Sequence, residues 1–148
     1  MGKARGKMLG PGDAAPDVSL EKLGGGEERL RGGKVLLAFF KISCPVCQLT
    51  LPYLDRVHPG AKVWAVSQNG AEDTADFARH YGLTLPILLD PEDRFPASNA
   101  FGITNVPTMF QLDAGGRIEK VIEGWDRTEM AALGALREGD DVPAWKAG

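Results

Sequence analysis

The sequence predicts an α/β fold in which helices flank a central mixed β-sheet. Residues 35–66 carry the pattern of a strand, a helix and a second strand, which is the unit that builds parallel sheets. Residues 108–123 hold two further strand-like runs joined by turn residues, which predicts an antiparallel pair. A chain of 148 residues is long enough to bury such a sheet in one domain core.

The first elements are a lead-in and short edge strands. Residues 1–17 show little periodicity and are expected to be extended. A short strand is predicted over 18–20, a turn at the glycines 24–26, and a second edge strand beginning at Leu30. The run 35–40 has no polar alternation, as expected for a central strand that is covered on both faces.

A helix is predicted over 45–58, because apolar side chains recur there at spacings of three and four. Its first residue is a proline, which suits a first turn, whereas Pro52 removes an internal N–H donor and predicts a kink. Gly60 is expected to end the unit before a strand over 63–66. A right-handed crossover between the two strands then places Cys44 at the carboxyl end of the first.

The second half of the chain alternates short helices and strands. A helix is predicted over 72–81, with acidic residues at its start and a glycine just beyond its end. A short strand over 87–89 and a short helix over 95–101 follow. The strand-like runs 108–112 and 118–123 flank four turn residues and predict a hairpin.

The last predicted helix begins at Asp126, which has a glutamate three residues later in the spacing of a capping box. Its apolar residues continue to about Arg137. The polar residues 138–148 are predicted to form a tail that is loose apart from Trp145. The chain is therefore divided into a lead-in over 1–17, one domain over 18–137 and this tail.

Composition and charge exclude several classes of function. Hydrophobic residues make up 43% and charged residues 25% of the chain, which is typical of a folded globular protein. The 17 basic and 20 acidic residues give a net charge of -3, and no basic stripe with interleaved aromatic residues is present, so nucleic-acid binding is not expected. The longest apolar run is far shorter than the roughly 18 residues of a membrane span.

The N-terminal residues do not have the pattern of an export signal. Lys3, Arg5 and Lys7 supply positive charge, but the glycine-rich and proline-containing segment 10–13 follows where a signal peptide needs an apolar stretch. This pattern favours the cytoplasm. The periplasm is the alternative if a signal was removed ahead of these residues.

The two cysteines, Cys44 and Cys47, form a C-P-V-C motif at the junction of the buried strand and the helix. Unpaired N–H groups and the positive end of the helix dipole favour a thiolate at Cys44, which is predicted to attack a disulfide. Cys47 lies one turn inward and is predicted to resolve the resulting mixed disulfide. The motif therefore predicts thiol–disulfide exchange.

A static disulfide or half of a zinc site is the structural alternative for this pair. The other strong ligands are His58 and His80, and C-x2-C-x10-H-x21-H is not a standard zinc-finger spacing. A closed loop of four residues would constrain the unfolded chain little, so a purely stabilising bridge is poorly motivated. Neither histidine is given a catalytic part, and no metal or cofactor is predicted.

In combination, these motifs resemble the thioredoxin superfamily, and within it the TlpA/ResA-like and AhpC/TSA-type redoxins. The resemblance covers about residues 12–137. Residues 39–47 resemble the strand and active site of that branch, and 81–90 resemble its inserted central segment. Residues 101–108 and 113–118 resemble its closing strands.

The resemblance implies a thioredoxin-like fold and a thiol–disulfide oxidoreductase that acts as a reductant. It also implies a cis peptide before Pro107, with Val106 offering backbone groups beside Cys44 to an extended substrate segment. The expected partners are protein thiols or disulfides and an unidentified thiol electron donor. The protein is expected to be a monomer.

Three positions depart from the family pattern. Ser43 stands where most relatives have an aromatic residue before the first cysteine, and Ala38 and Thr50 stand where relatives carry a buried carboxylate. No buried carboxylate is therefore expected. Proton transfer to or from Cys47 would use water, or Lys41 if that side chain points inward.

Two other functions remain as alternatives. A thioredoxin-like binding module with weakly active cysteines fits the missing aromatic residue and carboxylates. A peroxide-reducing antioxidant protein would need a threonine three residues before its peroxidatic cysteine and a proline four residues earlier. Cys44 has Lys41 and Leu37 at these places, and Cys47 has Cys44 and Phe40, so peroxidase chemistry is disfavoured.

Overall fold

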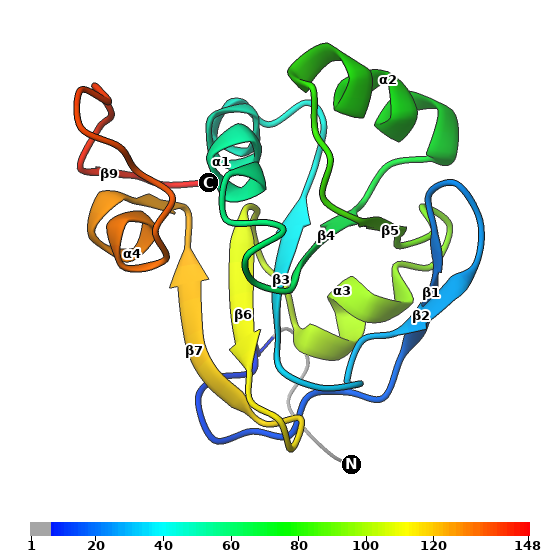
Figure 1. Cartoon of the computed structure of the whole chain (residues 1–148). Helices are drawn as coiled ribbons and strands as arrows, with labels where there is room; N and C mark the ends of the chain where they lie inside the picture. The colour runs from blue at the N-terminus through cyan, green and yellow to red at the C-terminus, as the bar shows by residue number, and fades with distance from the viewer. Residues whose placement is uncertain (1–6) are drawn as a thin grey trace.

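The computed structural model describes residues 7–148, which form a mixed β-sheet with helices on both of its faces (Figure 1). The lead-in predicted over 1–17 is therefore seen only from residue 7, and Lys3 and Arg5 lie outside the described residues. In the described part of the lead-in Leu9 is buried, so this segment packs on the domain.

Seven strands form the main sheet in the order β2-β1-β5-β4-β3-β6-β7. Their bounds are β1 (Ser19–Lys22), β2 (Glu27–Arg29), β3 (Val35–Phe40), β4 (Val63–Ser67), β5 (Ile87–Leu89), β6 (Thr108–Leu112) and β7 (Ile118–Glu123). β3 runs parallel to β4 and β4 to β5, whereas the hairpin of β6 and β7 is antiparallel and joins the other side of β3. The predicted central strand, crossover and hairpin are confirmed.

The edge of the sheet differs slightly from the prediction. The sequence predicts a second edge strand from Leu30, but β2 ends before that residue, at Arg29. Leu30 is completely buried, and its N–H donates to the carbonyl of Val18 at 2.9 Å. The apolar side chain of Leu30 therefore indicates a position in the core and not the start of a strand.

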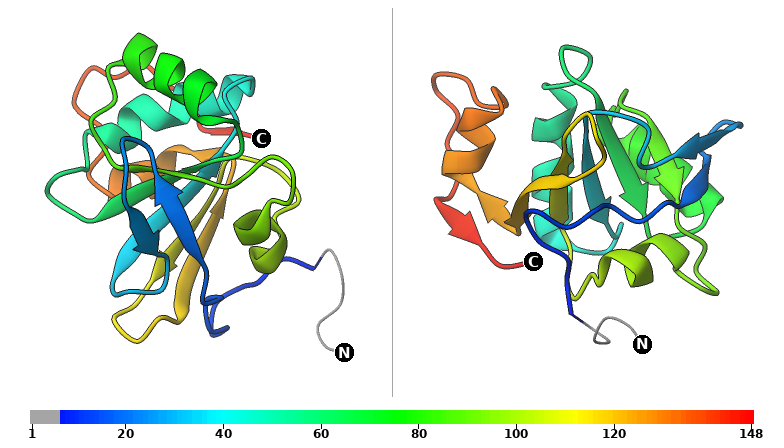
Figure 2. Two further views of the ribbon diagram at one scale, coloured as in Figure 1. Left: turned by 90° about the vertical axis from the view of Figure 1, so that its right-hand side faces the viewer. Right: turned by 90° about the horizontal axis from the view of Figure 1, so that it is seen from below.

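The four helices are α1 (Pro45–Asp55), α2 (Ala71–Tyr81), α3 (Pro96–Phe101) and α4 (Arg127–Ala132). Neighbouring side chains of β3 show which face α2 and α3 cover, because successive residues of a strand point to opposite faces. Phe40 packs against Phe77 of α2 with ring centroids 5.3 Å apart, and Phe39 packs against Phe101 of α3 at 5.2 Å. Figure 2 shows α3 on the side of the sheet opposite α1 and α2.

No helix within the described residues is both long and apolar enough to cross a lipid bilayer.

α1 is shorter at its C-terminal end than its pattern predicts. The apolar stripe extends over 45–58, but the helix ends at Asp55. Pro59 lies shortly beyond, and a proline disfavours helical conformation in the residue before it, so the last predicted turn is not part of the helix. Pro52 lies inside α1 and leaves the carbonyl of Gln48 without a helical N–H partner.

α4 is also shorter than predicted. Asp126 caps the helix as predicted, and its side chain accepts a hydrogen bond from the N–H of Glu129 at 3.1 Å. The helix is predicted to reach about Arg137 but ends at Ala132. Gly134 adopts a left-handed φ of 84°, a conformation that stops a helix.

Residues 138–148 are predicted to form a tail that is loose apart from Trp145, and the structure shows more order in this tail than predicted. β9 (Trp145–Lys146) pairs with β8 (Trp125–Asp126) in a second, two-stranded sheet. Val142 is buried, whereas Trp145 keeps 59% of its surface exposed. Hydrogen bonds between backbone groups order this segment. Such bonds form whether the side chains are polar or apolar, so the polar composition does not prevent them.

Candidate active site

The loop after β3 delivers Cys44 to the N-terminus of α1. β3 ends at Phe40 and α1 begins at Pro45, so that Cys44 is the N-cap residue. Its backbone is extended, with φ −88° and ψ 117°, and its sulfur accepts a hydrogen bond from the N–H of Cys47 at 3.3 Å. A sulfur at this position faces the free N–H groups of the first helical turn and the positive end of the helix dipole.

The loop before β6 lies opposite Cys44. β6 runs antiparallel to β3, so the residues ahead of β6 reach the edge of the sheet at which β3 ends. The Cys44 thiol donates to the carbonyl oxygen of Val106 at 3.6 Å. The peptide between Val106 and Pro107 is cis, as the resemblance implies, and both residues are buried. The fold therefore brings the predicted site residues Cys44, Cys47, Val106 and Pro107 together.

Cys47 lies one turn inside α1 and is completely buried. Burial raises the pKa of its thiol, because the charged form loses its hydration. The backbone N–H and the charge of Lys41 lower this pKa and the neighbouring Cys44 raises it, but burial is the largest influence. Cys47 is therefore a thiol at neutral pH and has to lose its proton before it can attack.

Comparison with known proteins identifies the family of this chain. Residues 11–121 match the family model of the AhpC/TSA family. The chain belongs to the AhpC/TSA family. The thiol-disulfide oxidoreductase ResA of Geobacillus thermodenitrificans is 35% identical over 122 residues, which cover 76% of this chain and 69% of that protein. This AhpC/TSA-family chain is a thiol–disulfide oxidoreductase.

Solved structures confirm that the AhpC/TSA-family chain has a thioredoxin-like fold. The thioredoxin domain of a thiol-disulfide oxidoreductase from Bacteroides vulgatus superposes with a TM-score of 0.72 at 21% identity, covering 84% of this chain and 99% of that domain. StoA from Bacillus subtilis superposes with a TM-score of 0.66 at 23% identity, covering 81% and 98%.

The positions that depart from the family pattern lie around the cysteine pair. Ser43 is exposed beside Cys44, so this protein has no aromatic surface at that point. Thr50 is completely buried, and its hydroxyl donates to the carbonyl of Val46 at 2.7 Å. That hydrogen bond lies within α1, so the Thr50 hydroxyl is already engaged and does not replace a carboxylate as a proton acceptor.

Asp90 is a buried carboxylate that the sequence reasoning missed. The absence of a carboxylate is predicted for the positions beside the cysteines, and the buried Asp90 lies elsewhere, directly after β5. It accepts hydrogen bonds from the N–H groups of Ala97 and Ser98 at 2.9 and 2.8 Å and from the Ser98 hydroxyl at 2.6 Å. All three bonds hold the start of α3, so Asp90 positions that helix and is not directed at the cysteines. The strand-ending Asp-Pro pair was the only signal in the sequence.

Lys41 was a candidate proton carrier only if its side chain points inward, and the structure does not meet that condition. Its side chain is exposed at the end of β3. Together with Val106 it lines a pocket of about 260 Å³, whose other walls come from α3 and the loop 103–105.

The two histidines lie away from the cysteine pair. His58 lines a separate pocket at the amino end of β4, together with Pro59 and Trp64. His80 is exposed at the end of α2 and packs edge-to-face on Tyr81, with centroids 4.7 Å apart. Neither histidine contributes to the candidate active site.

Proposed function

We propose that this thiol–disulfide oxidoreductase reduces disulfide bonds in protein substrates, with Cys44 as the attacking thiol and Cys47 as the resolving thiol. The observation that carries the proposal is the position of Cys44. Its half-buried sulfur sits at the helix N-cap beside the backbone carbonyl of Val106, while the second sulfur is buried one turn further into the helix. The two sulfurs therefore differ in exposure, which suits the more exposed one to attack a substrate and the buried one to resolve the mixed disulfide.

The reaction proceeds in two displacements. The Cys44 thiolate attacks one sulfur of the substrate disulfide, whose S–S bond breaks, and the departing substrate thiolate takes up a proton. Cys47 then loses its proton and attacks the Cys44 sulfur of the mixed disulfide, which releases the second substrate thiol. The substrate gains two electrons, and the protein is left with a Cys44–Cys47 disulfide.

Val106 and Pro107 are proposed to bind the substrate. An extended segment that carries the substrate disulfide needs backbone partners next to the sulfur it presents. The Val106 carbonyl is 3.6 Å from the Cys44 sulfur and supplies such a partner. Pro107 has no N–H to compete for it.

The partners follow from the same chemistry. We propose protein disulfides as substrates and a thiol electron donor that returns the Cys44–Cys47 disulfide to the dithiol. The protein is proposed to act as a monomer, because Trp145 is the single large hydrophobic side chain exposed in the described part of the chain. Size-exclusion chromatography with light scattering tests this assignment, and a dimer mass would contradict it.

A redox titration and an insulin assay test the function. A reductant is expected to have a potential near that of thioredoxin, about −270 mV, whereas an oxidant lies near −120 mV. The protein is expected to accelerate insulin reduction by dithiothreitol. An unaccelerated reaction, with Cys44 alkylated by iodoacetamide no faster than a model thiol, would favour the binding module instead.

A further inference from the structure

The segment from Pro143 to Gly148 runs back along β8 toward the active site. The indole N–H of Trp125 donates to the carbonyl of Pro143 at 2.7 Å, and the N–H of Arg127 donates to the carbonyl of Ala144 at 2.9 Å. β9 then pairs with β8 through two residue pairs. In Figure 1 the end marked C lies beside α1 and the start of β6.

The backbone of this segment touches the loop that holds Val106. Gly148 lies so close to Val106 and Pro107 that a Cβ added to it would clash with the Val106 carbonyl oxygen. The same oxygen accepts the hydrogen bond of the Cys44 thiol. One carbonyl therefore faces both the attacking sulfur and residue 148.

A second close approach guides the segment to this place. Gly124 has a left-handed φ of 71° between β7 and β8, and a Cβ there would clash with the carbonyl oxygen of Lys146. The nitrogen of Gly148 is 3.3 Å from the same Cβ position. Glycines at 124 and 148 thus let residues 146–148 lie flat between β8 and the Val106 loop.

We propose that residues 145–148 form a strap that occupies the docking position for a substrate segment at Val106 and leaves it before a protein disulfide binds. The inference rests on the proposed function, since it assumes that substrates dock on the Val106 backbone. An extended strand of a partner protein, with a small residue opposite Val106, is the kind of occupant that replaces the strap.

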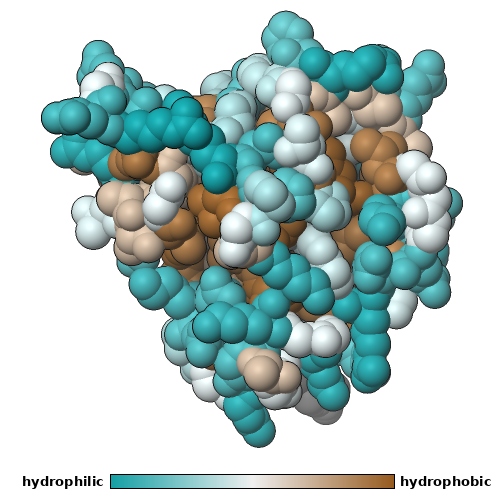
Figure 3. Space-filling model, in the orientation of Figure 1, coloured by the Kyte–Doolittle hydropathy of each residue, from teal (hydrophilic) through white to brown (hydrophobic). Residues whose placement is uncertain are grey.

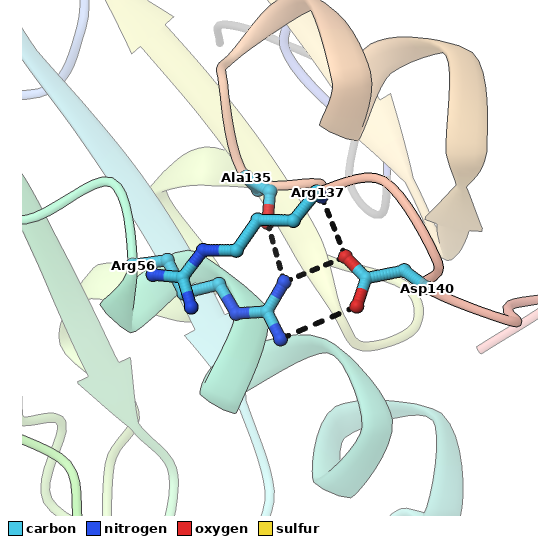
Figure 4. Close-up of polar contacts among 4 residues, drawn as sticks. All are labelled: Arg56, Ala135, Arg137 and Asp140. Atoms are coloured by element: carbon cyan, nitrogen blue, oxygen red, sulfur yellow. Dashed lines mark hydrogen bonds and ion pairs between the residues drawn. The ribbon is translucent and has the colours of Figure 1, made fainter.

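The strap is anchored at one end and weakly held at the other. Asp140 pairs with Arg56 of the turn after α1 at 2.7 Å, and its carboxylate also accepts from the N–H of Arg137 at 2.6 Å (Figure 4). Arg56 also donates to the carbonyl of Ala135 at 3.1 Å. These contacts hold the chain before the strap.

Residues 145–148 themselves are exposed on their outer side and share a short ladder with β8. Few buried contacts and few backbone hydrogen bonds mean that such a segment opens at low cost. A released strap remains tethered by the Asp140–Arg56 pair, so it can return after each turnover.

Competition of this kind affects large and small reactants differently. The apparent affinity for a docking substrate falls by the fraction of molecules whose docking position is free. A strap that is closed in about 70–90% of molecules therefore weakens protein-substrate binding about three- to tenfold. Iodoacetamide needs only the Cys44 sulfur, and Cys44 remains half-buried with the strap in place.

The variant Gly148→Leu tests the strap in the full chain, with Ala147→Leu as the matched control. Leucine at 148 cannot lie against the Val106 carbonyl, whereas residue 147 is exposed and tolerates the same side chain. Gly148→Leu is expected to raise kcat/KM for insulin disulfides about three- to tenfold. Ala147→Leu is expected to leave it within about twofold of wild type.

A second measurement separates the strap from the redox chemistry. Cys44 is alkylated with an extended peptide that carries an iodoacetyl group and, separately, with iodoacetamide. The ratio of the two rates is expected to rise about three- to tenfold in Gly148→Leu and to stay unchanged in Ala147→Leu. An unchanged ratio in Gly148→Leu overturns the strap and leaves the proposed function intact. A raised ratio without insulin reduction in any variant keeps the strap and overturns the proposed function.

Discussion

The sulfur of Cys44 and the carbonyl oxygen of Val106 lie 3.6 Å apart, although 62 positions separate the two residues in the sequence. The antiparallel pairing of β3 with β6 creates this contact, because it places the end of one strand beside the beginning of the other. Figure 3 shows apolar residues gathered in the middle of the visible face and hydrophilic residues around them.

Replacing Cys47 is expected to stop the reaction at the mixed disulfide. The variant Cys47→Ser keeps the Cys44 sulfur at the N-cap but removes the thiol that releases the substrate. Incubation with an oxidised protein substrate should therefore accumulate a covalent adduct, which non-reducing electrophoresis and mass spectrometry detect. Cys44→Ser is the control and should form none. An adduct of equal yield in Cys44→Ser would contradict the distinct roles assigned to the two cysteines.

The reduced protein is expected to lose stability in alkaline solution because of Cys47. Its pKa is raised in the folded state, so the folded protein holds this proton more tightly than the unfolded chain does. The stability contributed by the thiol is present below the unfolded pKa, about 8.5, and is lost as the pH rises above it. One proton contributes a slope of at most about 1.4 kcal/mol per pH unit.

The measurement for this effect is urea unfolding of the reduced protein between about pH 7 and pH 10. Cys47→Ala removes the titrating group and should show a shallower loss of the free energy of unfolding. Parallel curves for wild type and Cys47→Ala would contradict a raised pKa at this residue.

The Asp140–Arg56 pair is expected to stabilise the fold above acidic pH. The hydrogen bond from Arg56 is the main reason that the pKa of Asp140 is lowered, followed by the backbone N–H of Arg137. A carboxylate with a lowered folded pKa contributes stability above its unfolded pKa, about 3.9, and loses that contribution as the pH falls. The Tm of wild type should exceed that of Asp140→Asn at pH 7.

Acidification checks the sign of this prediction. The difference in Tm between wild type and Asp140→Asn should shrink below about pH 4, where the wild-type carboxyl becomes protonated. Asp141→Asn is the matched control, since Asp141 is an exposed neighbour with no recorded ion pair among the described residues. A difference in Tm that persists unchanged at low pH would show that the pair contributes packing and no charge interaction.

Trp125 is expected to stabilise the domain far more than Trp145 does. Trp125 is completely buried, its ring packs at 5.3 Å from that of Tyr53, and its indole N–H is bonded to Pro143. Trp125→Phe should reduce the free energy of unfolding by about 1–3 kcal/mol, since it leaves a void and removes the donor. Trp145→Phe changes an exposed ring and should cost less than about 0.5 kcal/mol. Chemical denaturation of the two variants provides the comparison, and equal losses would contradict the assignment of Trp125 to the core.

Local patterns in the chain were enough to predict half of the candidate site. The apolar run of β3, the proline at the start of α1 and the spacing of Cys44 and Cys47 all lie within one short segment. Helix and strand periodicity are properties of neighbouring residues, so they can be read without knowing the fold. The N-cap position of Cys44 follows from this segment alone.

Val106 and Pro107 are visible in the sequence only through family resemblance. Nothing in the residues around Val106 indicates that its carbonyl meets the Cys44 sulfur. Their contact depends on the register of β6 against β3, in which Thr108 lies opposite Phe39. That register is a property of the assembled sheet and of no single strand.

Burial of Asp90 and the ordering of residues 138–148 were decided by tertiary structure. Asp90 is buried because the N-terminus of α3 folds back over it, and it is satisfied there by two N–H groups and one hydroxyl. The tail is ordered by backbone groups of β8 and by the approach of Gly148 to Val106. Backbone N–H and C=O groups are common to nearly every residue, so their long-range pairing leaves no side-chain pattern to be read in the sequence.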